Sequence, residues 1–324
     1  MNPILALVLR RLALSGLILL LVSGLVFLGT EILPGDALDA TIPADELMYY
    51  TDEDLARMRA ELGLDRPALE RFIGVFWNLI TFDFGVSLLT QEPVLPSIWH
   101  PMMNSLLMAS VAIVLTPLVA IALGIWAALK PGGRADGMVS GGTLFAYSMP
   151  DFVVGNVFII VFALQLGLAP AVLMIAESAS WDQILAVAVL PVAALIVSGV
   201  AYQFRLLRAG MVEALDSEFI ERARLSGVPN WRLVVTHALP VALIPMLHGT
   251  AQFVAGVISG TVVIEAVFKF PGLGVELIRA ISQREVPTVQ AIAFVAAFAV
   301  ILSNLLADIG ILALDPRVRR KSHG

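Results

Sequence analysis

A short charged segment, residues 205–240, separates two long apolar segments of this sequence. Its candidates for contact with another protein are Glu221, Arg222, Ala223, Arg224 and Gly227. Carboxylate and guanidinium groups form charge-assisted hydrogen bonds with a partner, and a small residue such as Ala223 allows close approach. Gly227 suits the position just after a helix, and Pro229 suits the start of the next one. The spacing predicts a helix–turn–helix that docks a partner; the alternative is a solvated loop with an ordinary glycine cap.

Three further charges lie within or beside apolar segments, where a charge is costly and by default a functional candidate. Asp151 follows Pro150 and lies near the middle of its segment if one helix crosses the whole segment. It is then a candidate for lining a pore; the alternative is that a helix begins at Asp151, which caps it near the lipid headgroups. Glu265 and Lys269 lie at the outer end of another apolar segment, where an interfacial turn with charges reaching toward water is an equal alternative.

The residues that catalysis would need are missing. The sequence has no cysteine and only four histidines, far apart, so neither thiol chemistry nor a histidine-built metal site is expected. It holds no His-Glu-x-x-His motif, no conspicuous Ser–His pair and no Gly-x4-Gly-Lys-Ser/Thr phosphate-binding loop. An intramembrane enzyme is therefore disfavoured, no cofactor or nucleic-acid partner is expected, and any ATP-driven activity needs a separate ATPase.

The composition is that of a membrane protein. Hydrophobic residues make up 59% of the 324 residues and charged residues 14%, with a mean hydropathy of +0.90, whereas soluble domains carry about 25% charged residues. A helix needs roughly 20 apolar residues to cross a bilayer. Six uncharged segments meet that length: Leu12–Thr30, Pro101–Leu129, Phe152–Ala176 (extended backward by Gly137–Pro150), Gln183–Phe204, Ala238–Ile264 and Val286–Ala307. The sequence predicts an all-α polytopic membrane protein with six transmembrane helices.

Lysine and arginine predict the orientation of these spans, because cytoplasmic segments are enriched in them. With the N-terminus in the cytoplasm, six spans return the C-terminus to the same side. Of the 20 basic residues, 13 then face the cytoplasm and seven the outside. Both termini are therefore expected to be cytoplasmic.

The external segment between the first two spans is the longest polar region. Thr51 is a candidate helix N-cap with acidic residues in the first turn after it. A second, amphipathic patch consists of Leu69, Phe72, Ile73, Phe76 and Trp77. Such a patch lies either at the membrane interface or on the spans, and the interpretation favoured here is a small helical cap packed on the outer ends of the spans.

The charged segment and its surroundings resemble a known family. The spacing Glu221-x-Ala223-x3-Gly227-x11-Leu239-Pro240 is similar to the ATPase-docking loop of ABC-importer permeases, with departures at Arg222 and His237. Six sequence blocks, in the same order along the chain, resemble the dipeptide/oligopeptide/nickel branch of these permeases. Such systems usually carry two permeases, and the resemblance is to the first of them. The blocks are Leu33–Asp36, Glu61–Pro67, Phe82–Leu88, Phe268–Gly274, Pro287–Gln290 and Leu314–Arg317.

This resemblance implies the fold of an ABC type I importer permease and a pore subunit of the bacterial inner membrane that is not itself an enzyme. The implied partners are a second homologous permease forming the other half of the pore, two cytoplasmic ATP-binding subunits, an external substrate-binding protein and lipid. Residues Glu221 to Gly227 would contact the ATPase, and Glu265 and Lys269 would belong to the outer gate. The solute implied by default is a peptide, with nickel chelates and opines also in the family's range.

The expected organisation has four parts. Residues 1–30 form the N-terminal tail and first span, 31–100 an external helical loop, 101–314 a five-helix core with the docking loop 205–240, and 315–324 a basic cytoplasmic tail. The alternative function is an ion-coupled secondary transporter, which usually shows internal repeats and several membrane carboxylates. No repeat is evident in this sequence, and Asp151 is nearly alone.

Overall fold

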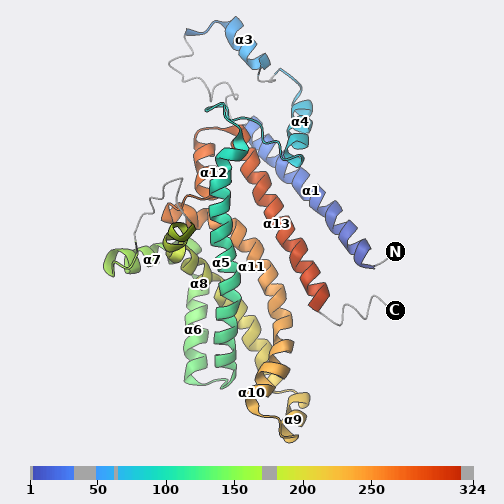
Figure 1. The fold of residues 1–324 in the computed structure, drawn as a ribbon, viewed down its shortest axis with the longest axis vertical. Helices are drawn as coiled ribbons and strands as arrows, with labels where there is room; N and C mark the ends of the chain where they lie inside the picture. Colours follow the sequence, from blue (N-terminus) through green and yellow to red (C-terminus); the bar gives the residue numbers. More distant parts are fainter. Residues whose placement is uncertain (1–2, 33–48, 62–64, 170–180, 315–324) are drawn as a thin grey trace. The chain divides into compact units, whose positions relative to one another are not determined.

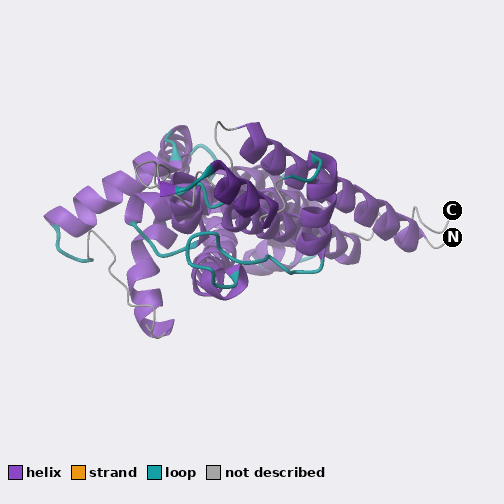
Figure 2. Cartoon of the chain, turned by 90° about the horizontal axis from the view of Figure 1, so that it is seen from above, coloured by secondary structure: helices purple, strands orange, loops and turns teal. Residues whose placement is uncertain are grey.

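The computed structural model describes residues 3–32, 49–61, 65–169 and 181–314, and within these ranges the chain is built of helices and connecting loops (Figures 1 and 2). The described helices are α1 (Pro3–Ile32), α3 (Asp52–Glu61), α4 (Ala68–Ile80), α5 (Val94–Ala128), α6 (Arg134–Ser148), α7 (Asp151–Phe158) with the π-helical η2 (Ile159–Gln165), α8 (Trp181–Leu215), α9 (Glu218–Leu225), α10 (Asn230–Arg232), the π-helical η3 (Leu233–Ala238), α11 (Leu239–Phe268), α12 (Leu273–Ser282) and α13 (Val286–Leu314). The predicted all-α class is confirmed.

The chain divides into two compact units. One comprises Met1–Asn104 and Pro271–Ile301, and the other Ser105–Phe270 and Leu302–Gly324. In the first unit, α3 begins after Thr51, as predicted: the Thr51 hydroxyl accepts a hydrogen bond from the Asp54 amide and donates one to the Asp54 carboxylate. That second hydrogen bond lowers the pKa of Asp54, because it stabilises the ionised carboxylate.

The described residues contain five helical segments that are long and apolar enough to cross a membrane: Leu9–Glu31, Val94–Ala128, Trp181–Leu215, Asn230–Leu247 and Val286–Leu306. A sixth is counted if α6 and α7–η2, which meet at 107°, form one broken span. The third predicted span is therefore not one continuous helix. Pro150 disfavours helical geometry for the residue before it, and Met149 is indeed extended (φ −91°, ψ 132°). The end of that predicted span, residues 170–176, lies outside the described residues.

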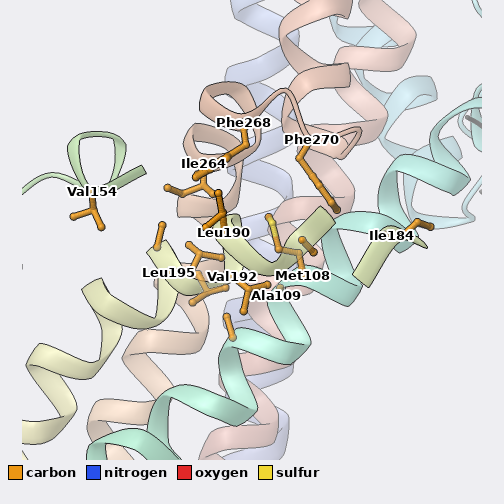
Figure 3. Packing of buried hydrophobic residues seen from close by; sticks show 14 residues of the cluster. Met108, Ala109, Val154, Ile184, Leu190, Val192, Leu195, Ile264, Phe268 and Phe270 are labelled. Carbon is orange, nitrogen blue, oxygen red and sulfur yellow. The ribbon is translucent and has the colours of Figure 1, made fainter. Parts of the chain in front are cut away.

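Two hydrophobic clusters hold the second unit together. In the first, shown in Figure 3, buried residues of α5, α7, α8 and α11 meet, among them Met108, Val154, Leu195, Ile264 and Phe268. The second joins α5 and α8 to the helices that follow α8; its members include Phe204, Leu207, Met211, Ile220, Leu233 and Ala238. Because α8 takes part in both clusters, it connects the core of this unit to the segment 205–240.

Helices α8 and α11 approach each other closely at glycines. A Cβ atom on Gly199 would lie 2.1 Å from the Phe253 ring, one on Gly210 3.0 Å from Ala242 Cα, and one on Gly249 2.4 Å from Leu206. The Gly256/Gly260 pair of α11 has the Gly-x3-Gly spacing that often marks close helix contacts, but it does not serve this one. A Cβ on Gly256 would meet nothing within 4 Å, and one on Gly260 would meet only the Asp151 carboxylate at an ordinary 3.5 Å.

Candidate docking and pore sites

The candidate docking helix, α9, is attached to the second unit by one face. Ile220 is fully buried in the second hydrophobic cluster, and Ala223, one turn later, packs against the same cluster. The i, i+3 spacing places both side chains on one face of the helix. Ala223 was expected to be the small residue that lets a partner approach. The structure packs Ala223, half-buried, against the chain's own core.

The end of α9 is a Schellman turn, as the sequence indicated for Gly227. The Gly227 amide donates to the Arg224 carbonyl (3.0 Å), and the Val228 amide donates to the Ala223 carbonyl (3.2 Å). Gly227 has φ +84°, a left-handed conformation that residues with a Cβ adopt only with strain. The turn fixes the angle between α9 and α10, which begins after Pro229.

The outer face of this segment combines charge with exposed apolar side chains. Glu221, Arg222 and Arg224 are exposed, and Arg222 forms an exposed ion pair with Glu218 (3.2 Å). Leu225 is 82% exposed and Trp231 62% exposed. Arginine and tryptophan are the side chains most enriched at the centres of protein interfaces. The sequence analysis did not identify Leu225 or Trp231. The signal for Leu225 was that it lies away from the helix face that Ile220 and Ala223 define.

An ion pair fixes the last part of α8, within the candidate docking segment 205–240. Arg208 of α8 donates two hydrogen bonds to the Asp136 carboxylate of α6, one through Nε and one through Nη2 (2.5 and 2.6 Å). The Gly132 amide and the Ser140 hydroxyl also donate to this carboxylate, at 2.8 and 3.1 Å. Asp136 is buried, with all its hydrogen bonds coming from α8, α6 and the α5–α6 turn. That turn and α9 lie at the same end of the second unit (Figure 1).

Asp151 lies at the bend between α6 and α7. It is the first residue of α7, the N-cap is Pro150, and no side-chain cap is formed, so the expected capping role for Asp151 is not seen. Its carboxylate is half-buried and points toward α11, where its Oδ2 atom is 3.5 Å from the place a Cβ on Gly260 would occupy. The absence of a side chain on Gly260 leaves room for this carboxylate between α7 and α11.

Glu265 and Lys269 are only four residues apart but lie in different environments. Glu265 is fully buried and accepts a hydrogen bond of 2.6 Å from the Ser105 hydroxyl of α5. Lys269 is exposed, ends α11 in the left-handed conformation (φ 53°), and is followed by Phe270, whose amide donates to the Glu265 carbonyl. Thus Glu265 is held in the packed interior of this unit, whereas Lys269 faces outward.

One buried amide has no partner among the described residues. Gln203 of α8 is fully buried, and neither its Oε1 nor its Nε2 atom forms a hydrogen bond there. Thr116 of α5 is likewise buried with an unpaired hydroxyl, so the polar side chains in this part of the bundle are not what holds α5 and α8 together.

Comparison with known proteins identifies the family. The description "binding-protein-dependent transport system inner membrane component" matches residues 120–320. A peptide transport system permease protein of Brucella abortus strain 2308 is 33% identical over 317 residues, covering 97% of this chain and 99% of the relative. The dipeptide transport system permease protein DppB of Escherichia coli K12 is 30% identical over 337 residues, covering 97% and 98%.

Two solved structures share the fold. The inward-facing MetNI methionine ABC transporter superposes with a TM-score of 0.54 at 16% identity, over 67% of this chain and 96% of that chain. An amino acid ABC transporter determined with histidines gives 0.51 at 18% identity, over 67% and 93%. Fold, spans and sequence relatives agree. This chain belongs to the family of binding-protein-dependent transport system inner membrane components and is a multi-pass permease subunit of an ABC importer in the bacterial inner membrane.

Proposed function

We propose that this chain forms half of a pore that imports peptides, the other half coming from a second, homologous permease. Peptides are favoured because relatives matched over 97% of the chain are named for peptide and dipeptide transport. An external binding protein delivers the solute, and two cytoplasmic ATP-binding subunits supply the energy. The family of this chain leaves the ion-coupled alternative without support.

The observation that carries the docking assignment is the construction of the segment 205–240. Helix α9 is anchored by Ile220 and ended by the Gly227 turn, so its outer face is held in a fixed orientation. That face presents Glu221, Arg222, Arg224 and the exposed Leu225. A rigid surface of this kind transmits motion of an ATPase into α8, which the Asp136–Arg208 ion pair ties to α6.

The three membrane charges take roles in the pore. Asp151 lines the translocation path at the α6–α7 bend, because its half-buried carboxylate is accommodated beside Gly260 instead of being packed away. Glu265 stabilises the outer gate through the hydrogen bond it accepts from Ser105. Lys269 places a positive charge on the external side of the gate. Both termini are cytoplasmic in this arrangement, residues 31–100 lie on the external side of the membrane, and residues 101–314 form the permease core.

The test of docking is Gly227→Val in the complete transporter. A β-branched residue at φ +84° costs roughly 1–2 kcal/mol and reorients the α9–α10 turn. The variant should still insert into the membrane. At least tenfold less ATPase should co-purify with it than with the unchanged permease, and substrate-stimulated ATP hydrolysis should fall to the same extent. The matched control is Gly85→Val, which places the same strain (φ +68°) outside the docking segment and should retain ATPase. Equal retention by both variants would refute the docking assignment.

A further inference from the structure

Helix α4 has three distinct faces around its axis. With about 100° per residue, Arg71, Phe72, Val75, Phe76 and Leu79 form one face, and these side chains are half-buried or buried. A second face consists of Leu69, Ile73, Trp77 and Ile80, which are between 38% and 68% exposed. The third consists of Glu70, Gly74 and Asn78, also exposed. A helix that met only water and its own protein would need no second face.

The packed face lies against the last turns of α1. The Phe72 ring is 3.7 Å from the place a Cβ on Gly24 would occupy, and its centroid is 5.5 Å from that of Phe27. Arg71 lies over the Phe27 ring at 5.9 Å and forms an ion pair with Glu31. These contacts fix the position of α4 along α1, between Gly24 and Glu31.

That stretch of α1 belongs to a membrane span. The segment Leu9–Glu31 is long and apolar enough to cross a bilayer, and Glu31 is its last residue. Leu21, Leu25 and Leu28 of the same stretch are exposed side chains on this span. A helix held beside residues 24–31 therefore lies at the depth where the hydrocarbon meets the headgroups.

We propose that α4 is an interfacial membrane helix: its Leu69–Ile73–Trp77–Ile80 face contacts lipid, while its Glu70–Gly74–Asn78 face contacts water. The charge pattern fits, because the helix has two charged residues: Glu70, on the water face, and Arg71, paired with Glu31. Tryptophan favours this depth, where its ring is apolar and its N–H reaches water. The segment between the first two spans is thus partly membrane-embedded, which distinguishes it from a wholly external loop.

The absence of cysteine makes a direct test possible. Single variants Ile73→Cys, Asn78→Cys and Leu25→Cys are spin-labelled in the complete transporter in lipid vesicles, and collision rates with oxygen and with a water-soluble nickel chelate are measured. Oxygen concentrates in the hydrocarbon and the chelate in water. The label at 73 should show an oxygen-to-nickel ratio several-fold above that at 78 and approaching that at 25, which is the lipid-facing reference.

Two results would overturn the proposal. Equal ratios at 73 and 78 would show that the apolar face is in water. A label at 73 that neither reagent reaches would show that protein covers it, such as the second permease. Measurement with and without the external binding protein separates a permanent protein cover from one that forms on docking. Because the readout is depth in the membrane, it does not depend on which solute is transported.

Discussion

Helices α9 and α4 are built alike but expose different side chains. Each is short, lies between membrane spans, and is anchored by aliphatic or aromatic residues on one side: Ile220 and Ala223 in α9, Phe72 and Leu79 in α4. Their free sides differ. That of α9 carries Glu221, Arg222 and Arg224 with two separated exposed apolar side chains, Phe219 and Leu225, whereas α4 exposes a continuous apolar strip.

Under the two proposals above, the anchored side of each helix fixes its position, and the free side selects its partner. A charged side with isolated apolar residues suits a protein partner, because each charge can be paired at a polar rim. A continuous apolar strip beside a membrane span suits lipid. Three pairs of substitutions test this comparison and are given in order of decreasing expected effect.

The largest effect is expected from Ile220→Asp. A carboxylate in the fully buried site of Ile220 has no partner, and burying it costs several kcal/mol, so α9 should detach from its cluster. We expect a loss of more than tenfold in ATPase retention, measured by co-purification, while the protein stays inserted. Ile220→Val costs about 1 kcal/mol and should retain the ATPase. If the Ile220→Asp variant retains as much ATPase as the unchanged permease, the anchored face does not position the docking surface.

An intermediate effect is expected from Asp136→Asn. Removing the buried charge of Asp136 leaves the half-buried Arg208 guanidinium of α8 without its ionic partner, so the thermal midpoint in detergent should fall by roughly 5–10 °C. The matched control is Glu218→Gln, which breaks the fully solvated Glu218–Arg222 pair on α9 and should shift the midpoint by less than about 2 °C. Equal shifts would mean that the Asp136–Arg208 pair contributes no more than a surface pair.

The smallest effect separates the two free sides. Leu225→Ser removes an exposed apolar side chain from the α9 surface and should weaken ATPase binding about 5- to 30-fold in a titration, which corresponds to 1–2 kcal/mol at an interface. Ile73→Ser makes the same kind of change on α4 and should leave ATPase binding unaltered. A loss of affinity in the α4 variant alone would reverse the assignments of the two helices.

Much of the fold and of the candidate docking segment could be predicted, because the patterns that indicate them involve residues close together in the sequence. The spans followed from runs of apolar residues, the start of α3 from Thr51 and Asp54, and the Gly227 turn from a glycine beyond a helical run followed by proline. The bend at Pro150 was not foreseen as a break between two helices, although the proline itself was noted. A break at a proline is tolerated where neighbouring helices satisfy the backbone hydrogen-bonding groups that it frees. The sequence of one segment does not reveal which helices will be its neighbours.

Composition and residues close together in the chain were enough to predict the class of the protein, the approximate limits of its apolar spans and the charged helical segment 205–240 between two of them. The tertiary structure alone decided which glycines allow α8 and α11 to approach, the pairing of Asp136 with Arg208 across 72 residues, and the burial of Glu265 against Ser105. It also packed Ala223 against the second hydrophobic cluster and left Leu225 exposed. These features depend on contacts between distant helices, and the period of one helix cannot specify which of its neighbours will cover each face.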